Sequence, residues 1–293
     1  MTTTQPAAAA GSFLLGGELS VNRLGYGSMR LSGPGIMGPP RDRKEAIAVL
    51  RGAVELGVNH IDTSDYYGPH IVNELIREAL HPYPEDLVLV TKVGARRTPE
   101  GGWLPALSAT ELTDAVHDNL NRLGLDQLSA VNLRMADADG GVMREGSLAE
   151  QFEVLAGLQQ QGLIGHLGIS NVGSDQLVEA RTIAPVACVQ NAYNVVTRDD
   201  EDLVDLCAAD GIAFVPFFPL GGFTPLAADQ FAGVAESIGA TTMQLALAWL
   251  LQRSPAILCI PGTSSLAHLR ENLAAGSITL TADQLDELDR LAR

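Results

Sequence analysis

The chain contains 293 residues, of which 46% are hydrophobic, and its 19 basic and 35 acidic side chains give a formal net charge of −16. A field of that sign repels nucleic acid and anionic membranes, which makes both poor partners. The apolar content is ample for a large core, and a barrel of alternating strands and helices reaches a similar length as one domain.

The first ten residues, MTTTQPAAAA, lack the positive segment and the long apolar core of a secretory signal. We expect residues 1–11 to be a disordered tail and residues 12–293 to form a single domain. No run of about 18 apolar residues occurs, so we expect no membrane span. Three scattered cysteines suit a reducing cytosol and are too few for a disulfide framework or a metal site: Cys188, Cys207 and Cys259.

A β-hairpin is predicted first, because the segments 13–15 and 19–21 flank a turn at 16–18. Eight strands follow, at 23–28, 58–62, 87–92, 128–134, 164–170, 186–191, 212–217 and 256–261. Amphipathic helical patterns lie between the strands, for example at 44–57, 108–124, 147–162 and 201–211. Ser108 and Glu111 have the spacing of a capping box, and glycines stand at the predicted helix ends.

Eight strand–helix units close most simply into a (β/α)₈ TIM barrel, an α/β fold, with the N-terminal β-hairpin covering the bottom of the barrel. The alternative α/β architecture is a doubly wound Rossmann sheet, which predicts a G-x-G-x-x-G motif after the first strand. The segment GYGSMR at 25–30 lacks the third glycine. The barrel is therefore favoured.

Polar side chains end many of the predicted strands. Active sites of such barrels lie at the carboxyl ends of the strands. Turns and helix caps alone do not account for so many polar residues on one rim, so we predict a functional site there. The residues are Ser28, Asp62, Lys92, Arg134, Ser170, Asn171 and Gln190.

The segment NHIDTSDYYG at 59–68, together with Lys92, contains the groups needed to protonate an alkoxide. Reduction of a carbonyl by hydride transfer leaves an alkoxide, which needs a proton from an acid that stays protonated in the ground state. A tyrosine with a pKa of about 10 is a weak acid for this purpose. A neighbouring lysine lowers that pKa, and a carboxylate such as Asp62 holds the lysine charged and in place.

These residues, with SN at 170–171 and IPGTSSLAHLREN at 260–272, resemble the aldo-keto reductase family over almost the whole chain. The resemblance implies an NADPH-dependent carbonyl reductase. In the family motif D-T-A-x-x-Y-G the catalytic tyrosine precedes the glycine, which selects Tyr67 as the general acid and leaves Tyr66 as a pocket wall or packing residue. Asp62, Tyr67 and Lys92 are then catalytic.

One residue departs from the family pattern. The family has a histidine at the end of the fourth strand, whereas the segment VNLRMAD at 131–137 places Arg134 there. An arginine can donate to a substrate oxygen, stabilise a developing alkoxide and lower the pKa of Tyr67, so Arg134 is assigned a catalytic and substrate-binding role. The alternative is that Arg134 pairs with Asp137 and only shapes the pocket.

The resemblance also implies the cofactor site. Ser170, Asn171 and Gln190 would hold the nicotinamide carboxamide, and Phe217 would stack on the ring unless it belongs to the core. Gly262 to Ser265 lead into a helix N-terminus, which favours a phosphate. The remaining implied cofactor residues are Gly27, Ser28, Asp62, Leu220, Gly222, Thr263, Ser264, His268, Glu271 and Asn272. His268 replaces an arginine of the family, which weakens without reversing the preference for NADPH over NADH.

Several stretches, VNLR and VPFFPLGGFTPL (215–226) among them, resemble a bacterial subgroup of the family, the pyridoxal reductases. This implies reduction of pyridoxal to pyridoxine, with a small-molecule carbonyl as the partner. Met29 and Trp103 are expected pocket walls, and the loop 95–108 that carries Trp103 is either a lid or rim packing. A monomer is the default expectation, since such barrels bury their helices without a partner.

Two other functions stay open. A broad aldehyde or ketone reductase would share the catalytic and cofactor residues, so the sequence separates it only by the subgroup stretches. An NADPH-binding regulatory protein with little turnover is the alternative from another class. The presence of Asp62, Tyr67 and Lys92 argues against a regulatory protein, because a pure binding module gains nothing from a lysine-activated phenol.

Overall fold

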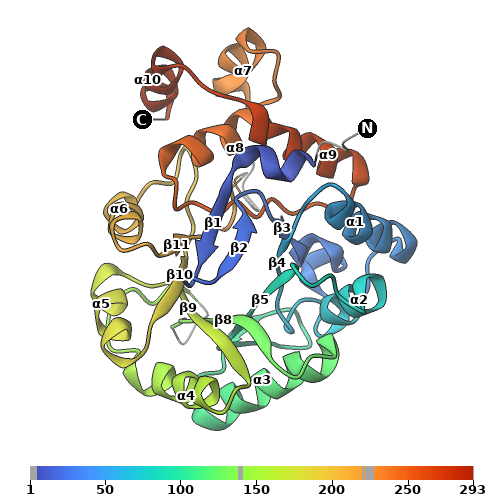
Figure 1. Ribbon diagram of the computed structural model, residues 1–293, viewed down its shortest axis with the longest axis vertical. Helices are drawn as coiled ribbons and strands as arrows, with labels where there is room; N and C mark the ends of the chain where they lie inside the picture. Colours follow the sequence, from blue (N-terminus) through green and yellow to red (C-terminus); the bar gives the residue numbers. More distant parts are fainter. Residues whose placement is uncertain (1–4, 138–140, 220, 222–227, 293) are drawn as a thin grey trace.

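The fold is a ring of parallel strands surrounded by helices, as Figure 1 shows for the computed structural model, which describes residues 5–137, 141–219, 221 and 228–292. Seven strands are hydrogen-bonded in the order β11-β10-β9-β8-β5-β4-β3. Their bounds are β3 Tyr26–Gly27, β4 His60–Asp62, β5 Val88–Val93, β8 Leu128–Arg134, β9 Ile164–Ser170, β10 Val186–Gln190 and β11 Ala213–Phe214.

Residues 256–259 close the ring between β11 and β3. Parallel bridges join Phe214 to Ile257 and Leu24 to Cys259. The amide of Leu258 donates to Phe214 O at 2.9 Å, and the amide of Cys259 donates to Arg23 O at 2.8 Å. The predicted eighth strand therefore occupies its place through isolated bridges, and the predicted (β/α)₈ barrel with its N-terminal hairpin is confirmed.

The hairpin consists of β1 Ser12–Leu15 and β2 Leu19–Asn22, paired antiparallel as the sequence predicts. Leu15 and Val21 are buried in one apolar cluster with barrel side chains such as Val88, Val90 and Leu258. Burial of these side chains removes apolar area from water at the lower end of the barrel. The hairpin thus covers the bottom and leaves the carboxyl ends of the strands open for a site.

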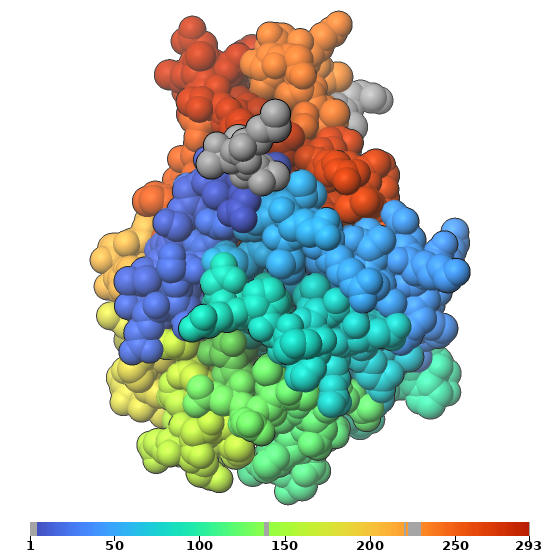
Figure 2. Space-filling model, turned by 45° about the vertical axis from the view of Figure 1, so that its right-hand side comes forward, coloured from blue at the N-terminus to red at the C-terminus, as the bar shows by residue number. Residues whose placement is uncertain are grey.

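The helices follow the strands around the ring. They are α1 Arg43–Glu55, α2 Ile71–Leu80, α3 Ala109–Leu123, α4 Ala149–Gln160, α5 Ser174–Ile183, α6 Glu201–Ala209, α7 Ala228–Ser237, α8 Thr242–Arg253, α9 Leu266–Ala274 and α10 Ala282–Leu291. The predicted capping box of Ser108 and Glu111 is present at α3. In the space-filling view the orange and red C-terminal segments stand as a projection above the barrel body (Figure 2).

Two segments differ from the expectation. Residues expected in a disordered tail form a 3₁₀ helix, η1 Pro6–Ala10, in which Ala7 is fully buried and its amide donates to Leu56 O at 3.2 Å. Alanine side chains lose no rotamer freedom on burial, which favours this ordering. The expected loop at 95–108 contains a second antiparallel hairpin, β6 Ala95–Arg97 with β7 Trp103–Pro105. This hairpin fixes where Trp103 lies.

No single helix of the described ranges is long and apolar enough to cross a membrane. The segments Gln230–Ser237 and Thr242–Arg253 meet the length and composition criteria only together, across a bend of 81°.

Arg23 fastens the closing segment of the ring. Its Nη2 donates to Leu251 O and to Ser254 O, both at 2.6 Å, and its Nε donates to Ile257 O at 3.1 Å. Two of these carbonyls lie at the end of α8, where helical carbonyls have no partner within the helix. One side chain therefore joins the end of α8, residues 256–259 and the start of the barrel.

Replacement of Arg23 by alanine is expected to lower the free energy of unfolding by roughly 3 kcal/mol, because it strands several part-buried carbonyls. Urea unfolding followed by circular dichroism measures the change. Arg43→Ala is the control: Arg43 pairs with Glu78, but both side chains are nearly half exposed. Such a pair contributes less than about 1 kcal/mol. Equal losses in the two variants would contradict the role given to Arg23.

Candidate active site

A cavity of about 460 Å³ opens at the carboxyl ends of the barrel strands. The strand-end residues predicted on chemical grounds lie in its wall, together with residues of the loops above. Among the predicted residues the lining contains Gly27, Met29, Asp62, Tyr67, Lys92, Trp103, Arg134, Ser170, Asn171, Gln190, Phe217 and Gly262. The barrel therefore brings most of the predicted set together at one place.

Asp62 and Lys92 form an ion pair at the base of this cavity. The two residues lie near the carboxyl ends of the neighbouring strands β4 and β5, whose register places Asp62 opposite Val90. Lys92 Nζ donates to Asp62 Oδ1 at 2.5 Å and to Thr63 O at 3.0 Å, and both charged side chains are about 95% buried. Gln190 Nε2 donates to the second carboxylate oxygen at 2.9 Å. The pair is thus hydrogen-bonded on both sides, as a buried ion pair requires.

Tyr67 lies above the pair, with Lys92 Nζ 5.2 Å from the centre of its ring. Burial raises the pKa of Tyr67 well above its usual value, and the Asp62 carboxylate adds to the rise, whereas the Arg134 guanidinium opposes it. The sequence led us to expect both Lys92 and Arg134 to lower this pKa. In the structure Lys92 is paired with Asp62, and Arg134 opposes the rise in the Tyr67 pKa. The phenol therefore keeps its proton through the neutral range, as a general acid must before the reaction.

Arg134 ends β8, in register with Ser170 on β9. Its Cζ lies 5.8 Å from the ring centre of Trp103, which comes from β7. The Tyr66 ring contacts Trp103 edge-on, at 5.6 Å between ring centres. Asp137 accepts from Gly141 N at 2.7 Å. Arg134 lies beside aromatic side chains, an arrangement suited to a planar substrate.

The residues expected at the nicotinamide are almost fully buried in the cavity wall. Ser170, Asn171 and Gln190 are at most 3% exposed. Within the described ranges, Gln190 Oε1 and Ser28 Oγ are buried and have no hydrogen-bond partner. A buried acceptor without a partner costs about 1–3 kcal/mol, so Gln190 Oε1 suits the amide hydrogens of a bound carboxamide. Phe217 also lines the cavity, in edge-to-face contact with Phe218.

The glycines of the site permit close approach of two backbones. A Cβ atom on Gly27 would lie 2.5 Å from Ile260 O, and one on Gly262 would lie 2.6 Å from Gly27 O. Any side chain at either position would separate the end of β3 from the loop that follows residue 259. Gly27, Ile260, Pro261 and Gly262 all line the cavity at this contact.

The loop expected to hold a phosphate leads into the N-terminus of α9. Ser265 caps this helix, and Thr263 Oγ1 accepts from Ser265 N at 3.1 Å. The amide of Leu266 donates to Glu45 Oε1 at 3.2 Å, a carboxylate contact that the sequence did not indicate. Ser264 and His268 are exposed, Asn272 is buried, and Glu271 accepts from Thr241 Oγ1 at 2.8 Å. Leu220 and Gly222 lie outside the described residues.

Tyr66, expected as a pocket wall or packing residue, does line the cavity. Other wall residues were missed from the sequence: Arg30, Ile36, Val142, Phe218, Pro219, Ile260 and Pro261. Ile36 ends a short 3₁₀ helix, Pro34–Ile36, and Val142 lies in a loop; neither segment is long enough for a periodic pattern to mark the side that faces a cavity.

Comparison with known proteins places this geometry in context. The sequence profile of the Aldo/keto reductase family matches residues 23–293. The pyridoxine 4-dehydrogenase of Escherichia coli (strain K12) is 60% identical over 285 residues, which cover 97% of this chain and 99% of that protein. An uncharacterized oxidoreductase of Schizosaccharomyces pombe is 39% identical and covers 93% of this chain and 87% of its own length.

Solved structures agree with the sequence comparison. The thermostable aldo-keto reductase Tm1743, in complex with the inhibitor epalrestat, superposes with a TM-score of 0.80 at 30% identity and covers 96% of this chain and 99% of its own. The aldo-keto reductase of Klebsiella pneumoniae in complex with NADPH gives a TM-score of 0.79 at 26% identity, covering 96% of this chain and 94% of its own.

His60, two residues before Asp62 on the same side of β4, makes the stability of this site sensitive to acid. Burial lowers the pKa of His60 to about 4, with the Asp62 carboxylate opposing the shift and the Lys92 ammonium adding to it. An unfolded histidine titrates near 6.5. Between these values the unfolded chain binds a proton that the folded chain refuses, so stability falls as the pH falls.

We expect the His60 contribution to the free energy of unfolding to be fully present above pH about 6.5 and to decrease by about 3 kcal/mol by pH about 4. The difference between wild type and His60→Gln, measured by urea unfolding across this pH range, isolates the contribution from that of the carboxylates. His117→Gln, at an exposed position of α3, is the control. A pH-independent difference for His60→Gln would contradict the assignment.

Proposed function

The chain belongs to the aldo/keto reductase family, and on that premise we propose that it reduces pyridoxal to pyridoxine with NADPH, with Tyr67 as the general acid. The observation that carries the proposal is the protonated phenol of Tyr67 in one cavity with the Lys92–Asp62 pair and Arg134. The relative at 60% identity is named as a pyridoxine dehydrogenase, which supports this substrate.

Each residue has a defined part in the proposed reaction. The chemistry supplied by bound NADPH is a hydride, which goes to the carbonyl carbon of the aldehyde. Tyr67 gives its proton to the oxygen that becomes negative, so that the aldehyde is converted to an alcohol. The cations of Lys92 and Arg134 favour the phenolate that remains, while Asp62 keeps Lys92 charged and in place. Ser170, Asn171 and Gln190 would hold the carboxamide, and Gly262 to Ser264 a phosphate.

Arg134 is the residue that we assign to substrate choice. Pyridoxal carries a phenolate and a ring nitrogen beside its aldehyde. A guanidinium keeps its charge at every physiological pH and presents several donors in one plane, so it suits a phenolate better than a histidine does. Trp103 and Tyr66 stand beside it and can bound a flat ring. These features favour pyridoxal over an unselective aldehyde reductase.

The proposed setting is a single chain in a reducing compartment. Cys188, Cys207 and Cys259 are free and buried, which is compatible with such a compartment.

Tyr67→Phe is expected to lower kcat for pyridoxal by about a hundredfold to ten-thousandfold, because it removes the proton donor while keeping the ring. The loss of NADPH absorbance reports turnover, and quenching of protein fluorescence reports cofactor binding, which should not change. If wild type binds NADPH tightly and turns over no carbonyl, a regulatory role replaces the proposed reaction. If Tyr67→Phe keeps full turnover, another group is the acid.

Arg134→His is expected to reduce kcat/KM for pyridoxal about tenfold to a hundredfold more than kcat/KM for 4-nitrobenzaldehyde, which has no phenolate. The assay is run at a pH above the usual histidine pKa of about 6.5, so that the introduced imidazole is neutral. The variant then lacks the cation that we pair with the substrate phenolate. The ratio of the two values is the readout, since any effect on Tyr67 applies to both aldehydes. An unchanged ratio would remove Arg134 from substrate choice and favour a broad-specificity reductase.

A further inference from the structure

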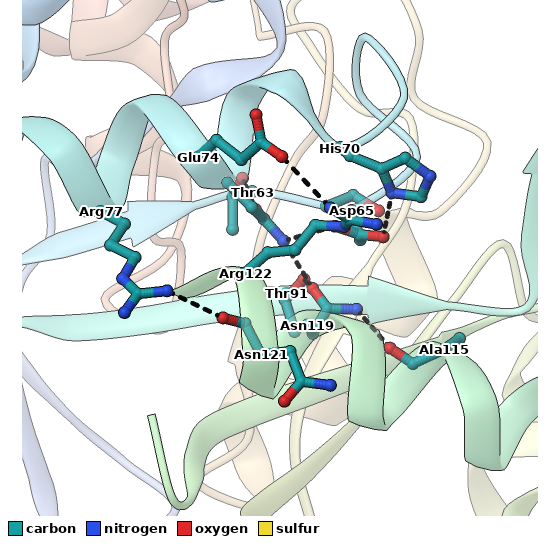
Figure 3. Close-up of polar contacts among 12 residues, drawn as sticks. Thr63, Asp65, His70, Glu74, Arg77, Thr91, Ala115, Asn119, Asn121 and Arg122 are labelled. Carbon is teal, nitrogen blue, oxygen red and sulfur yellow. Dashed lines mark hydrogen bonds and ion pairs between the residues drawn. The ribbon is translucent and has the colours of Figure 1, made fainter. Parts of the chain in front are cut away.

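Behind the Asp62–Lys92 pair, four polar side chains are buried where strands and helices of a barrel usually meet through apolar groups. Thr63 follows β4, Asn73 belongs to α2, Thr91 to β5 and Asn119 to α3, and each is 0% exposed. Figure 3 labels three of them, Thr63, Thr91 and Asn119, near α2 and α3. We call these four residues the amide bridge.

The amide bridge adjoins the ion pair through the chain itself. Thr63 directly follows Asp62, and Thr91 directly precedes Lys92. Successive side chains of a strand point to opposite faces. Asp62 and Lys92 therefore face the cavity, while the threonines face the helices. Any displacement of the threonines displaces the backbone that carries the ion pair.

The donor and the acceptor of every hydrogen bond in the amide bridge can be assigned without ambiguity. Asn119 Nδ2 donates to Ala115 O at 2.8 Å, and because a carbonyl only accepts, the orientation of this amide is fixed. Asn119 Oδ1 then accepts from Asn73 Nδ2 at 2.9 Å and from Thr91 Oγ1 at 2.5 Å. Asn73 Oδ1 is left to accept from Thr63 Oγ1 at 2.8 Å. Both threonine hydroxyls must therefore donate to asparagine oxygens, which fixes the side-chain rotamers of Thr63 and Thr91.

A charged cluster anchors the outer end of the amide bridge. Asn73 Nδ2 also donates to Asp65 Oδ1 at 3.3 Å, and the other oxygen of Asp65 contacts His70 Nδ1 at 2.6 Å. Arg122 of α3 lies 3.4 Å from Asp65 and 3.1 Å from Glu74 of α2 (Figure 3). Helices α2 and α3 are therefore joined to each other and to Asp65 at the same level as the amide bridge.

The inner end reaches Lys92 directly. The carbonyl oxygen of Thr63 accepts from Lys92 Nζ at 3.0 Å, while the amide of Thr63 donates to Val90 O at 2.8 Å. One residue, Thr63, thus has its hydroxyl held by Asn73 and its carbonyl held by the Lys92 ammonium. A buried polar network of this kind specifies one arrangement, whereas an apolar contact at the same place tolerates sliding.

We propose that the amide bridge positions the Lys92 ammonium, with Asn73 and Asn119 acting as positioning residues from α2 and α3. The proposal rests on the proposed function, in which Lys92 and Asp62 serve the acid Tyr67. Neither asparagine touches the cavity; each acts through Thr63 or Thr91. Displacement of a catalytic group by about 1 Å lowers rates by as much as about a hundredfold, so loss of the bridge should appear in the chemical step.

Paired variants at one position separate the hydroxyl from the side-chain volume. Thr63→Val removes the donor at nearly constant shape, and Thr63→Ser keeps it. We expect Thr63→Val and Asn73→Ala to lower kcat about tenfold to a hundredfold for pyridoxal and for 4-nitrobenzaldehyde alike. KM and NADPH affinity should stay within about twofold, whereas Thr63→Ser recovers most of kcat. The isotope effect on kcat with NADPH deuterated at the transferred position should rise, because the chemical step becomes slower.

Asn59→Ala is the matched control. Asn59 lies at the opposite end of β4, where its amide joins Asn22 N at 2.8 Å and Ser20 O at 2.9 Å. This variant also loses a two-sided amide contact, here to β2 of the hairpin and at the end of β4 away from Lys92. We expect a lower unfolding midpoint with kcat and the isotope effect unchanged. If Asn59→Ala lowers kcat as much as Asn73→Ala does, the amide bridge is merely structural and the proposal is overturned.

A crystal structure of Thr63→Val gives a readout that needs no activity. We expect Lys92 Nζ to shift from Thr63 O or Asp62 Oδ1 by more than about 0.5 Å, the tolerance of a catalytic arrangement. An unmoved ammonium would overturn the proposal whatever the substrate. If wild type reduces 4-nitrobenzaldehyde and not pyridoxal, the proposed substrate fails while the kinetic comparison still tests the bridge. If wild type reduces neither aldehyde, the position of Lys92 Nζ in the crystal structure of Thr63→Val tests the proposal by itself.

Discussion

The ammonium of Lys92, held inside the barrel away from water, is the constraint on which the rest of the site depends. A buried charge is tolerated only when it is paired and its hydrogen bonds are filled. Asp62 supplies the opposite charge and Thr63 a carbonyl, while Gln190 holds the second oxygen of Asp62. Because these partners come from β4 and β10, on separate parts of the sheet, the charge pair requires the closed ring that the hairpin and Arg23 stabilise.

The Asp62–Lys92 pair also influences the protonation state of Tyr67. Burial and the nearby Asp62 keep the phenol protonated, and Lys92 is engaged with Asp62 before any substrate binds. Arg134, at the position where the family resemblance led us to expect a histidine, opposes the rise in the pKa of the phenol. One substitution thus links two properties: the acidity of Tyr67 and the presence of a permanent cation beside the aromatic walls. A phenolate-bearing aldehyde fits both.

The sequence indicated the barrel and its rim because both rest on short-range regularities. Strand–helix alternation predicts the fold, and polar residues that end strands predict a shared rim. Asp62 and Lys92 were identified from these positions together with their residue types and the family motif. Contacts set by packing had no such signal. A single asparagine such as Asn73 in a helix does not reveal that it is buried against a threonine of a strand. The contact of Glu45 with the start of α9 depends likewise on how α1 sits beside that helix.

The protonation of Tyr67 in the free enzyme tests the account most directly. Tyrosine labelled with ¹³C at Cζ, observed by NMR as the pH rises and assigned through Tyr67→Phe, reports that state. The buried site described here predicts that Tyr67 keeps its proton beyond the ordinary tyrosine pKa of about 10 and titrates at lower pH in Asp62→Asn, which removes the carboxylate that raises its pKa. Titration of wild-type Tyr67 near neutral pH, or no change in Asp62→Asn, would contradict it.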